Sequence, residues 1–151
     1  MLKLIHILSV ILLLGNLIVG AVWRWFAQRS SEQQIHKFSL KVLQKNDLIF
    51  TLPTILLIGI TGHMLAPKFG GIAAHGWIYH SYAFLTVATL IWAMGIIPLQ
   101  RKQFKLINEA HSLKEAGIRY QTLSRWWSIM LVIVVILTLA ALYLMVTHPM
   151  A

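Results

Sequence analysis

The sequence predicts an all-α integral membrane protein, a single domain (residues 1–151) of four transmembrane helices in an up-down-up-down bundle. The chain is 58% hydrophobic and only 11% charged, whereas soluble domains carry about 25% charged residues. Four apolar runs are each close to the ~20 residues that a helix needs to cross ~30 Å of hydrocarbon. The runs cover residues 2–23, 48–66, 77–99 and 126–147. Two long connections and one short connection favour antiparallel neighbours in the bundle.

The first run is interpreted as a retained helix rather than a cleaved signal peptide. Its basic leader is one residue, Lys3, and the apolar stretch is longer than the core of a signal peptide. It ends at Trp23 and Arg24 without the small-residue pattern of a cleavage site. The chain has no cysteine, which excludes disulfides and thiolate metal ligands.

The later elements have their own signals. Pro53 lies inside the second run and predicts a kink that frees a carbonyl one turn earlier, and Pro98 ends the third run. The connection at residues 30–47 is expected to form either an interfacial helix or an extension of the second span. The connection at residues 101–124 is also expected to be helical, with Gly117 as its break and Ser124 as the cap of the fourth span.

The basic residues predict how the chain threads the membrane. Of the 13 Lys and Arg residues, 11 lie in the two long connections. The positive-inside rule therefore places those connections in the cytoplasm, and both termini and the 67–76 loop in the periplasm, for a multi-pass protein of the bacterial inner membrane. The net charge of +9 is explained by topology and attraction to anionic lipid, and no nucleic-acid-binding motif is present.

Polar and small residues recur on one face of two runs. They are His6, Ser9, Leu13, Asn16, Gly20 and Trp23 in the first run, and Tyr79, Tyr82, Thr86, Thr89 and Ala93 in the third. Residues three or four apart share a helix face, and the hydrocarbon of a lipid bilayer cannot form hydrogen bonds with polar groups. These stripes are expected to face the bundle interior, and interhelical packing is enough to explain most of them.

Five of the seven histidines fall at the predicted periplasmic side. His6, His63 and His80 each lie about three residues inside a span, which places them roughly 4–5 Å below the boundary. Because the three lie at one level, their imidazoles are candidates to converge on a haem or a metal ion, with His75 and His148 as shallower candidate metal ligands. The alternative is that each is an interfacial anchor where Lys and Arg are excluded.

Two polar residues inside or beside the spans also need partners. Asn16 lies mid-span and is a candidate cofactor-binding residue, although Thr or backbone groups of a neighbouring helix would also satisfy its amide. Asp47 adjoins the second span and is expected to pair with Arg24, Arg125 or Lys45. No catalytic triad, phosphate loop or pair of carboxylates is found, so no catalytic residue is identified and an enzymatic activity is neither predicted nor excluded.

Several segments resemble a known family. The early His in "KLIHILSVILLLGNLIVGAVW", the Phe-Thr-x-Pro…Thr-Gly core of "NDLIFTLPTILLIGITGHMLA", the Pro-x-Gln of "WAMGIIPLQRKQFKL" and the Leu-Met-x-x-x-Pro ending occur in this order. They resemble domain-of-unknown-function family 2269, bacterial predicted integral membrane proteins with four spans. The resemblance covers nearly the whole chain and implies the same fold.

The first span is more remotely similar to HemJ-type protoporphyrinogen oxidases and to CopD-type copper-resistance proteins. Those proteins also begin with a His followed about nine residues later by Gly, here His6 and Gly15. The resemblance implies that His6 is a haem or copper ligand. HemJ-type enzymes also use a Lys in a later span, and neither the third nor the fourth span of this chain contains one.

The leading hypothesis is a membrane protein that binds b-type haem, or alternatively copper, near its periplasmic face for electron transfer or cofactor handling. His6 is the expected ligand, with His63 or His80 opposite it. The alternative is a non-enzymatic accessory or scaffold subunit that packs against a larger membrane complex or a second copy of itself. A small-solute carrier fits least well, because no charge lies deep in a span and no inverted repeat is visible.

Overall fold

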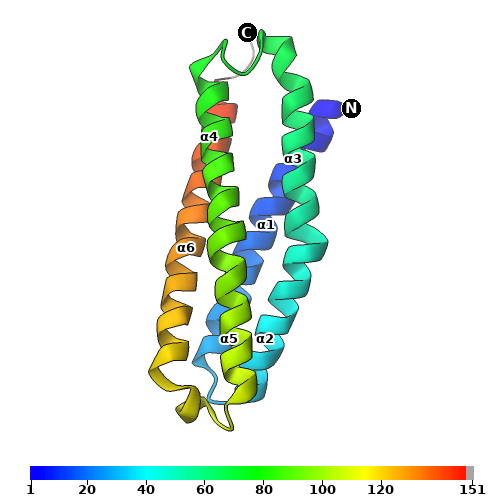
Figure 1. Cartoon of the computed structure of the whole chain (residues 1–151). Coiled ribbons are helices and arrows are strands. Elements are labelled where there is room, and N and C mark those ends of the chain that lie inside the picture. The colour runs from blue at the N-terminus through cyan, green and yellow to red at the C-terminus, as the bar shows by residue number, and fades with distance from the viewer. Residues whose placement is uncertain (149–151) are drawn as a thin grey trace.

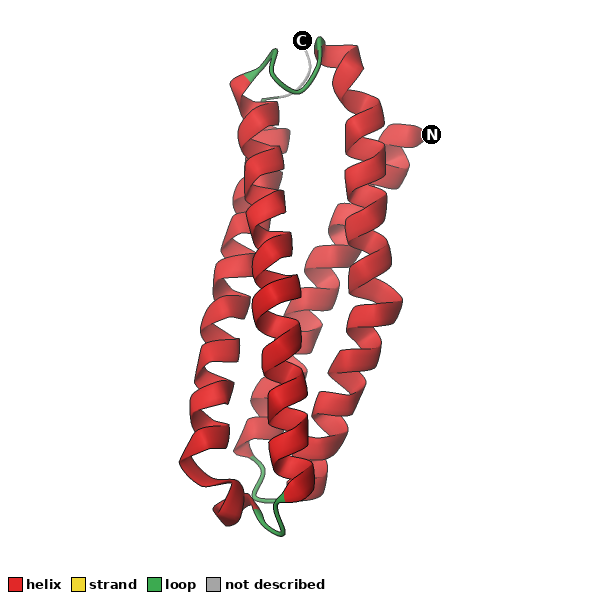
Figure 2. Ribbon diagram, in the orientation of Figure 1, coloured by secondary structure: helices red, strands yellow, loops and turns green. Residues whose placement is uncertain are grey.

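The computed structural model describes residues 1–148, and in this part of the chain all regular structure is helical (Figure 2). The elements in order are α1 (Leu2–Arg29), α2 (Gln33–Asn46), η1 (Asp47–Thr51), α3 (Leu52–Leu65), η2 (Ala66–Phe69), α4 (Gly76–Ile91), η3 (Trp92–Ile96), α5 (Ile97–Glu109) and α6 (Leu113–Thr147). The elements α2 to η2 follow one another without a break, as do α4 to α5, so the chain forms four long antiparallel helices (Figure 1). The predicted all-α four-helix class is confirmed. Pro149, in the sequence ending quoted above, lies outside the described residues.

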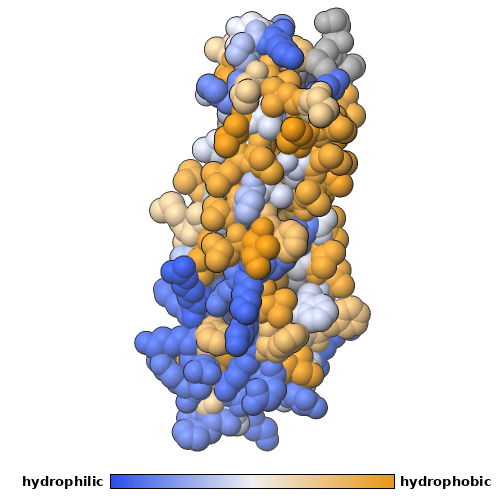
Figure 3. All heavy atoms as spheres, turned by 90° about the vertical axis from the view of Figure 1, so that its right-hand side faces the viewer, coloured by the Kyte–Doolittle hydropathy of each residue, from blue (hydrophilic) through white to orange (hydrophobic). Residues whose placement is uncertain are grey.

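The bundle has two distinct ends. The terminal end holds the start of α1, the end of α6 and the loop of residues 70–75. The basic end holds the two connections at residues 30–32 and 110–112 (Figure 1). Figure 3 shows an apolar band over most of the bundle and hydrophilic side chains gathered at the basic end. Each of the four helices is long and apolar enough to cross a membrane, and each contains one predicted span.

Two short π-helical segments interrupt the long helices, and each ends two residues before a proline. In η1 the N–H of Leu52 bonds to the carbonyl of Asp47, five residues earlier, and in η3 the N–H of Ile97 bonds to that of Trp92 in the same way. Proline has no N–H for the usual bond, and the widened turn lets the helix continue past it. Pro98 therefore does not end its helix, which runs on to Glu109.

Both connections that carry the basic residues are mostly helical. Residues 33–46 are continuous with the helix of the second span. Of the two predicted alternatives, the extension of that span is therefore correct, and the separate interfacial helix is not formed. In the other connection, Gly117 has a φ of 53° and breaks the helix as predicted. Ser112, not Ser124, caps α6, and its Oγ accepts a hydrogen bond from the N–H of Glu115.

The predicted inward stripes are only partly correct. His6, Ser9 and Leu13 are buried, but Trp23 is 48% exposed. In the third span Tyr79 is exposed, although it shares the stripe with better-covered residues. Thr86 and Ala93 of the same stripe are exposed as well, and only Tyr82 and Thr89 are half-buried, so most of the third-span stripe does not face the interior.

Arg24 is the most deeply enclosed charged side chain among the described residues, with 1% of its surface exposed. Its Nη2 donates to Gln103 Oε1, to Tyr120 Oη at 3.0 Å and to Ser124 Oγ at 3.1 Å. Its guanidinium also lies 5.8 Å from the ring centre of Trp127. The expected pairing of Arg24 with Asp47 is not formed, since every partner of the Asp47 carboxylate is neutral. Arg24 therefore fastens α1 to α5 and α6 through neutral oxygens.

A hydrogen-bond chain leads from Arg24 to His36. The Nε2 of His36 lies 2.9 Å from the carbonyl oxygen of Ser30, which only accepts, so Nε2 carries the proton. Its Nδ1 lies 3.0 Å from Tyr120 Oη and accepts the phenolic proton, while that oxygen accepts from Arg24. The neutral imidazole is thus fully paired, and protonation would add a charge beside the guanidinium.

We expect Tyr120→Phe to destabilise the protein by about 1–3 kcal/mol, because it leaves His36 Nδ1 without a donor and removes one of the three acceptors of Arg24 Nη2. Tyr143→Phe is the matched control, since Tyr143 is 66% exposed. The measurement is the unfolding midpoint of both variants in the same detergent. Equal midpoints for the two variants would contradict the role assigned to Tyr120.

His36 also predicts a pH dependence of stability at the basic end. Burial lowers the pKa of His36 from its ordinary value near 6.5, and nearby Arg24 lowers it further, against a smaller opposing effect of the Ser30 bond. The unfolded chain then binds the proton more readily than the folded one. Stability is therefore full above about pH 6.5 and falls as the pH drops through that value toward the lower folded pKa.

Unfolding midpoints between about pH 7.5 and 5.5 test this dependence. His36→Gln should flatten the profile, whereas His111→Gln, a change at an exposed position of the same end, should keep it. A wild-type profile that stays flat over this range would contradict the prediction.

Candidate functional site

The largest cavity described in the bundle lies at the terminal end and measures about 440 Å³. All four long helices contribute to its walls, among them His6 from α1, Gly62 from α3, Tyr82 from α4 and Met145 from α6. Most of the lining is apolar. Its size falls within the roughly 300–1,000 Å³ of ordinary small-molecule sites, so this cavity is the candidate functional site and is called the terminal pocket.

His6 is the buried imidazole of the terminal pocket, and its tautomer follows from its hydrogen bonds. Thr61 Oγ1 lies 2.9 Å from His6 Nδ1. The hydroxyl proton of Thr61 is already donated to the carbonyl of Leu57, one turn earlier in α3. Thr61 Oγ1 must therefore accept, and His6 Nδ1 carries the proton. This fixes the ring and leaves the Nε2 lone pair without a hydrogen bond among the described residues.

Gly62 and Tyr82 shape the space beside His6. A Cβ at position 62 would lie 3.3 Å from His6 Cε1 and 3.6 Å from Tyr82 Oη. The absence of a side chain there lets both rings approach α3 closely. Tyr82 Oη is buried and has no hydrogen-bond partner among the described residues. The terminal pocket therefore carries two polar atoms without partners, His6 Nε2 and Tyr82 Oη.

The histidines predicted to join His6 do not converge on it. His63 and His80 are exposed and do not line the terminal pocket, and His80 Nδ1 lies 2.6 Å from the carbonyl of Gly76 in its own helix. His75 is exposed and stacks near Trp77. His148 lines the pocket at its rim and also stacks on Trp77, with ring centres 6.4 Å apart. The prediction considered only how deep each histidine lies along its helix. The side chains of His63 and His80 point away from the terminal pocket, so they do not approach His6.

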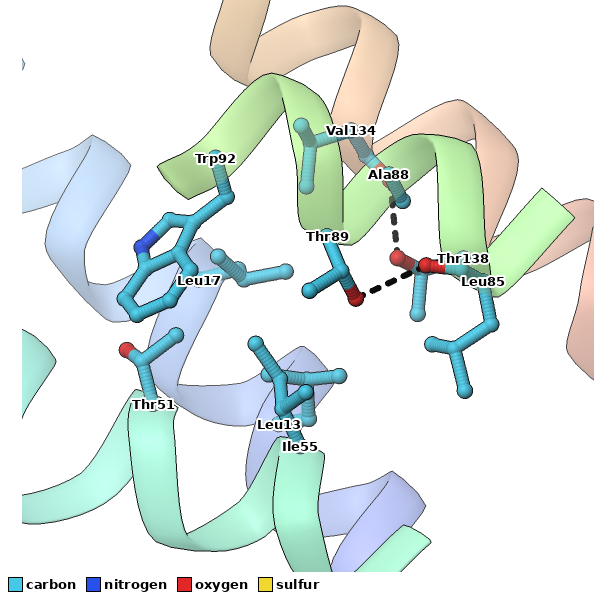
Figure 4. Close-up of a pocket in the computed structure, with 10 residues that line it drawn as sticks. All are labelled: Leu13, Leu17, Thr51, Ile55, Leu85, Ala88, Thr89, Trp92, Val134 and Thr138. Carbon is cyan, nitrogen blue, oxygen red and sulfur yellow. Dashed lines mark hydrogen bonds between the residues drawn. The ribbon is translucent and has the colours of Figure 1, made fainter. Parts of the chain in front are cut away.

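Asn16, the other predicted cofactor-binding residue, lies outside the terminal pocket. Its Nδ2 donates to Thr51 Oγ1 at 2.8 Å, and its Oδ1 accepts from Asn46 at 2.6 Å. A Thr of the neighbouring helix is thus its partner, as the sequence allowed. Another small space, of about 10 Å³, is lined by Thr51, Thr89 and Thr138 among other residues (Figure 4). The hydroxyls of Thr89 and Thr138 there donate to carbonyls of their own helices, so they offer little to a ligand.

Residues 1–148 contain no group of three or more His, Cys, Asp and Glu side chains able to hold a metal ion. The arrangement does not favour a multidentate metal centre. One imidazole with a free nitrogen beside a large apolar cavity is suited instead to a single axial bond or a single hydrogen bond. Sequence reasoning singled out His6 and placed Tyr82 on an inward stripe, but it missed Thr61, whose role depends on a contact 55 residues away in sequence.

Thr61→Val should destabilise the protein by about 1–3 kcal/mol, because it keeps the shape of the side chain but leaves the buried His6 N–H unpaired. Thr54→Val is a close control: Thr54 lies in the same helix, is equally buried and bonds only to carbonyls of the preceding turn. Unfolding midpoints of the two variants in detergent measure the difference. If Thr54→Val costs as much as Thr61→Val, the His6–Thr61 bond contributes nothing measurable.

Comparison with known proteins places this fold in a family. No curated protein and no solved structure gives a significant match. The remote similarity of the first span to HemJ-type and CopD-type proteins is not shown by these comparisons. A family model described as "Predicted integral membrane protein (DUF2269)" matches residues 1–149. Since the match covers almost the whole chain and the four helices are long and apolar enough to span a bilayer, the protein is a member of the DUF2269 family of integral membrane proteins.

Proposed function

We propose that the terminal pocket binds b-type haem, with His6 as the imidazole ligand, for electron transfer or cofactor handling in the membrane. The observation that supports this most directly is the fixed tautomer of His6. Histidines that ligate a metal commonly donate their other ring N–H to an oxygen, which orients the ring and raises its basicity. The His6–Thr61 bond has this arrangement, and it leaves Nε2 available beside an apolar cavity of about 440 Å³.

The donor set fits haem better than copper. A haem requires from the protein only one or two axial ligands, since the porphyrin supplies the other four. Protein copper sites are built from several imidazole or sulfur ligands, and no group of three His, Cys, Asp and Glu side chains exists within residues 1–148. His63 and His80 do not line the terminal pocket and are omitted from the proposed site, and His6 is the buried histidine of its lining. When bound, the haem would supply one-electron chemistry.

The lining of the terminal pocket also favours a ligand that arrives from the bilayer. Ile11 and Val146 line the pocket and are 59% and 65% exposed on the outer surface of the bundle. On a membrane-spanning helix such residues face lipid, so the pocket adjoins the hydrocarbon between α1 and α6. Lys3 lies at the pocket rim and provides a cation for a carboxylate of the ligand. A flat apolar molecule with carboxylates at one edge suits this arrangement.

The charge distribution supports a periplasmic position for the site. Of the 13 Lys and Arg residues, 11 lie toward the end opposite the terminal pocket, where Figure 3 shows hydrophilic side chains. The positive-inside rule assigns that end to the cytoplasm of a bacterial inner membrane. A haem at this level would lie near the outer face. The alternative, an accessory subunit of a larger membrane complex or of a homo-oligomer, requires no cofactor and is distinguished by the same experiment.

The test is the absorption spectrum of the purified, unboiled protein from haem-replete cells. We expect a Soret band that is lost in His6→Ala and retained in His63→Ala and His80→Ala, the matched histidine controls. Thr61→Val should weaken haem affinity by about 10–100-fold, the usual effect of losing a group that orients a metal ligand.

A colourless wild-type protein that also fails to take up added haemin would contradict the proposal. A Soret band that survives in His6→Ala would place the haem elsewhere. Co-purification of a colourless wild type with a larger complex would favour the accessory-subunit alternative.

A further inference from the structure

A second cluster of hydrogen-bonded polar groups surrounds the half-buried Asp47, in the half of the bundle toward the basic end and between the two π-helical segments. The Asp47 carboxylate accepts from Thr51 Oγ1 at 2.9 Å and from Trp92 Nε1 at 3.3 Å on one oxygen, and from Gln100 Nε2 at 2.9 Å on the other. Thr51 Oγ1 in turn accepts from Asn16 in α1. These bonds join α1, η1, η3 and α5. The described residues form no hydrogen bond from α6 to this cluster.

A small cavity of about 20 Å³ lies beside the cluster. Asp47, Asn16, Asn46 and Gln100 are its polar lining residues, and Trp127 of α6 also lines it. Trp127 is only 3% exposed, and its Nε1–H is buried with no acceptor among the described residues. An unpaired buried donor costs about 1–3 kcal/mol, so an acceptor is expected here.

The volume admits very few occupants. A water molecule requires at least about 10–15 Å³ of such space and two to four polar partners, and both conditions are met. A bare monovalent cation would also fit beside a carboxylate. The two are distinguished by Trp127, because an indole N–H donates only, and it repels a cation but bonds to a water oxygen.

We propose that this cavity binds one water molecule, which accepts from Trp127 Nε1–H and donates to the free lone pair of Asp47 Oδ2. The second proton of the water faces the amide oxygens of Asn16, Asn46 or Gln100. The water thereby adds α6 to the cluster, so that all four long helices are hydrogen-bonded together at the level of the two π-helical segments. The site is independent of the terminal pocket and of haem.

The test uses the full-length protein in lipid bilayers, with the indole nitrogens of tryptophan labelled with ¹⁵N. Water-edited solid-state NMR reports which indole N–H groups receive magnetisation from water, and Trp127→Phe identifies the Trp127 signal. We expect transfer to Trp127 although its side chain is buried. No transfer to Trp127, under conditions in which the half-exposed Trp25 receives it, would overturn the proposal.

Gly20→Ala provides a variant that displaces the water without touching a hydrogen-bonding group. Gly20 lines the cavity, and an added Cβ would meet only the end of the Leu43 side chain, at 3.3 Å. We expect the Trp127 transfer to disappear in this variant while the other indole signals stay in place. Transfer that persists at the wild-type rate would place the water elsewhere.

A cation in the same cavity is tested by ion substitution. Unfolding midpoints in equal concentrations of sodium, potassium and choline chloride should coincide for the wild type. A rise specific to one of the metal cations, absent in Asp47→Asn, would show that a cation occupies the cavity and would overturn the assignment of water.

Discussion

Polar groups inside this bundle must find their partners within the chain, because the lipid that surrounds it offers no hydrogen bonds. The Asp47 cluster shows how this constraint shapes the fold. Pro53 and Pro98 each remove one backbone donor, and each helix responds with a π-helical turn just before its proline. The two widened turns lie against each other through the bond from Trp92 to Asp47. The relative register of α3 and α4 thus depends on a carboxylate held by neutral donors.

Charge is accommodated in the same way at the basic end. Arg24 is buried and Asp47 is half-buried in the same bundle, yet these opposite charges do not pair, and each forms its hydrogen bonds with neutral side chains. Gln100 and Gln103, about one turn apart on α5, contact Asp47 and Arg24 respectively. Each charge is stabilised by several oriented dipoles, which fix its position from more directions than one ion pair would. The basic half of the bundle is accordingly densely cross-linked.

The terminal half is different, and this contrast locates the candidate function. Among the described residues, the long-range side-chain bonds between helices here are the one from His6 to Thr61 and the 3.4 Å bond from Ser81 Oγ to the carbonyl of Ala141, and the helices leave a cavity of about 440 Å³. Two polar atoms without hydrogen-bond partners among the described residues, His6 Nε2 and Tyr82 Oη, belong to residues that line this cavity. A polar atom left free beside an open space is the usual mark of a ligand or an ordered water. The hydrogen bonds of the basic half thus hold the helices together, and the terminal half contains the candidate site.

The sequence by itself determined the fold class, the four helices and the segregation of basic residues to one end, because run length, hydropathy and charge are local properties of a membrane-spanning chain. It also identified His6, Asn16 and Asp47 as polar residues in need of partners. Only the tertiary structure decided which partners they have. His63 and His80 have the same predicted depth as His6 but lie on outward faces of their helices. Depth can be obtained by counting residues along a span, whereas the direction in which a side chain points depends on how the helices pack. Thr61, Tyr82 and Trp127 gain their roles for the same reason: each depends on a contact between helices that no single stretch of sequence specifies.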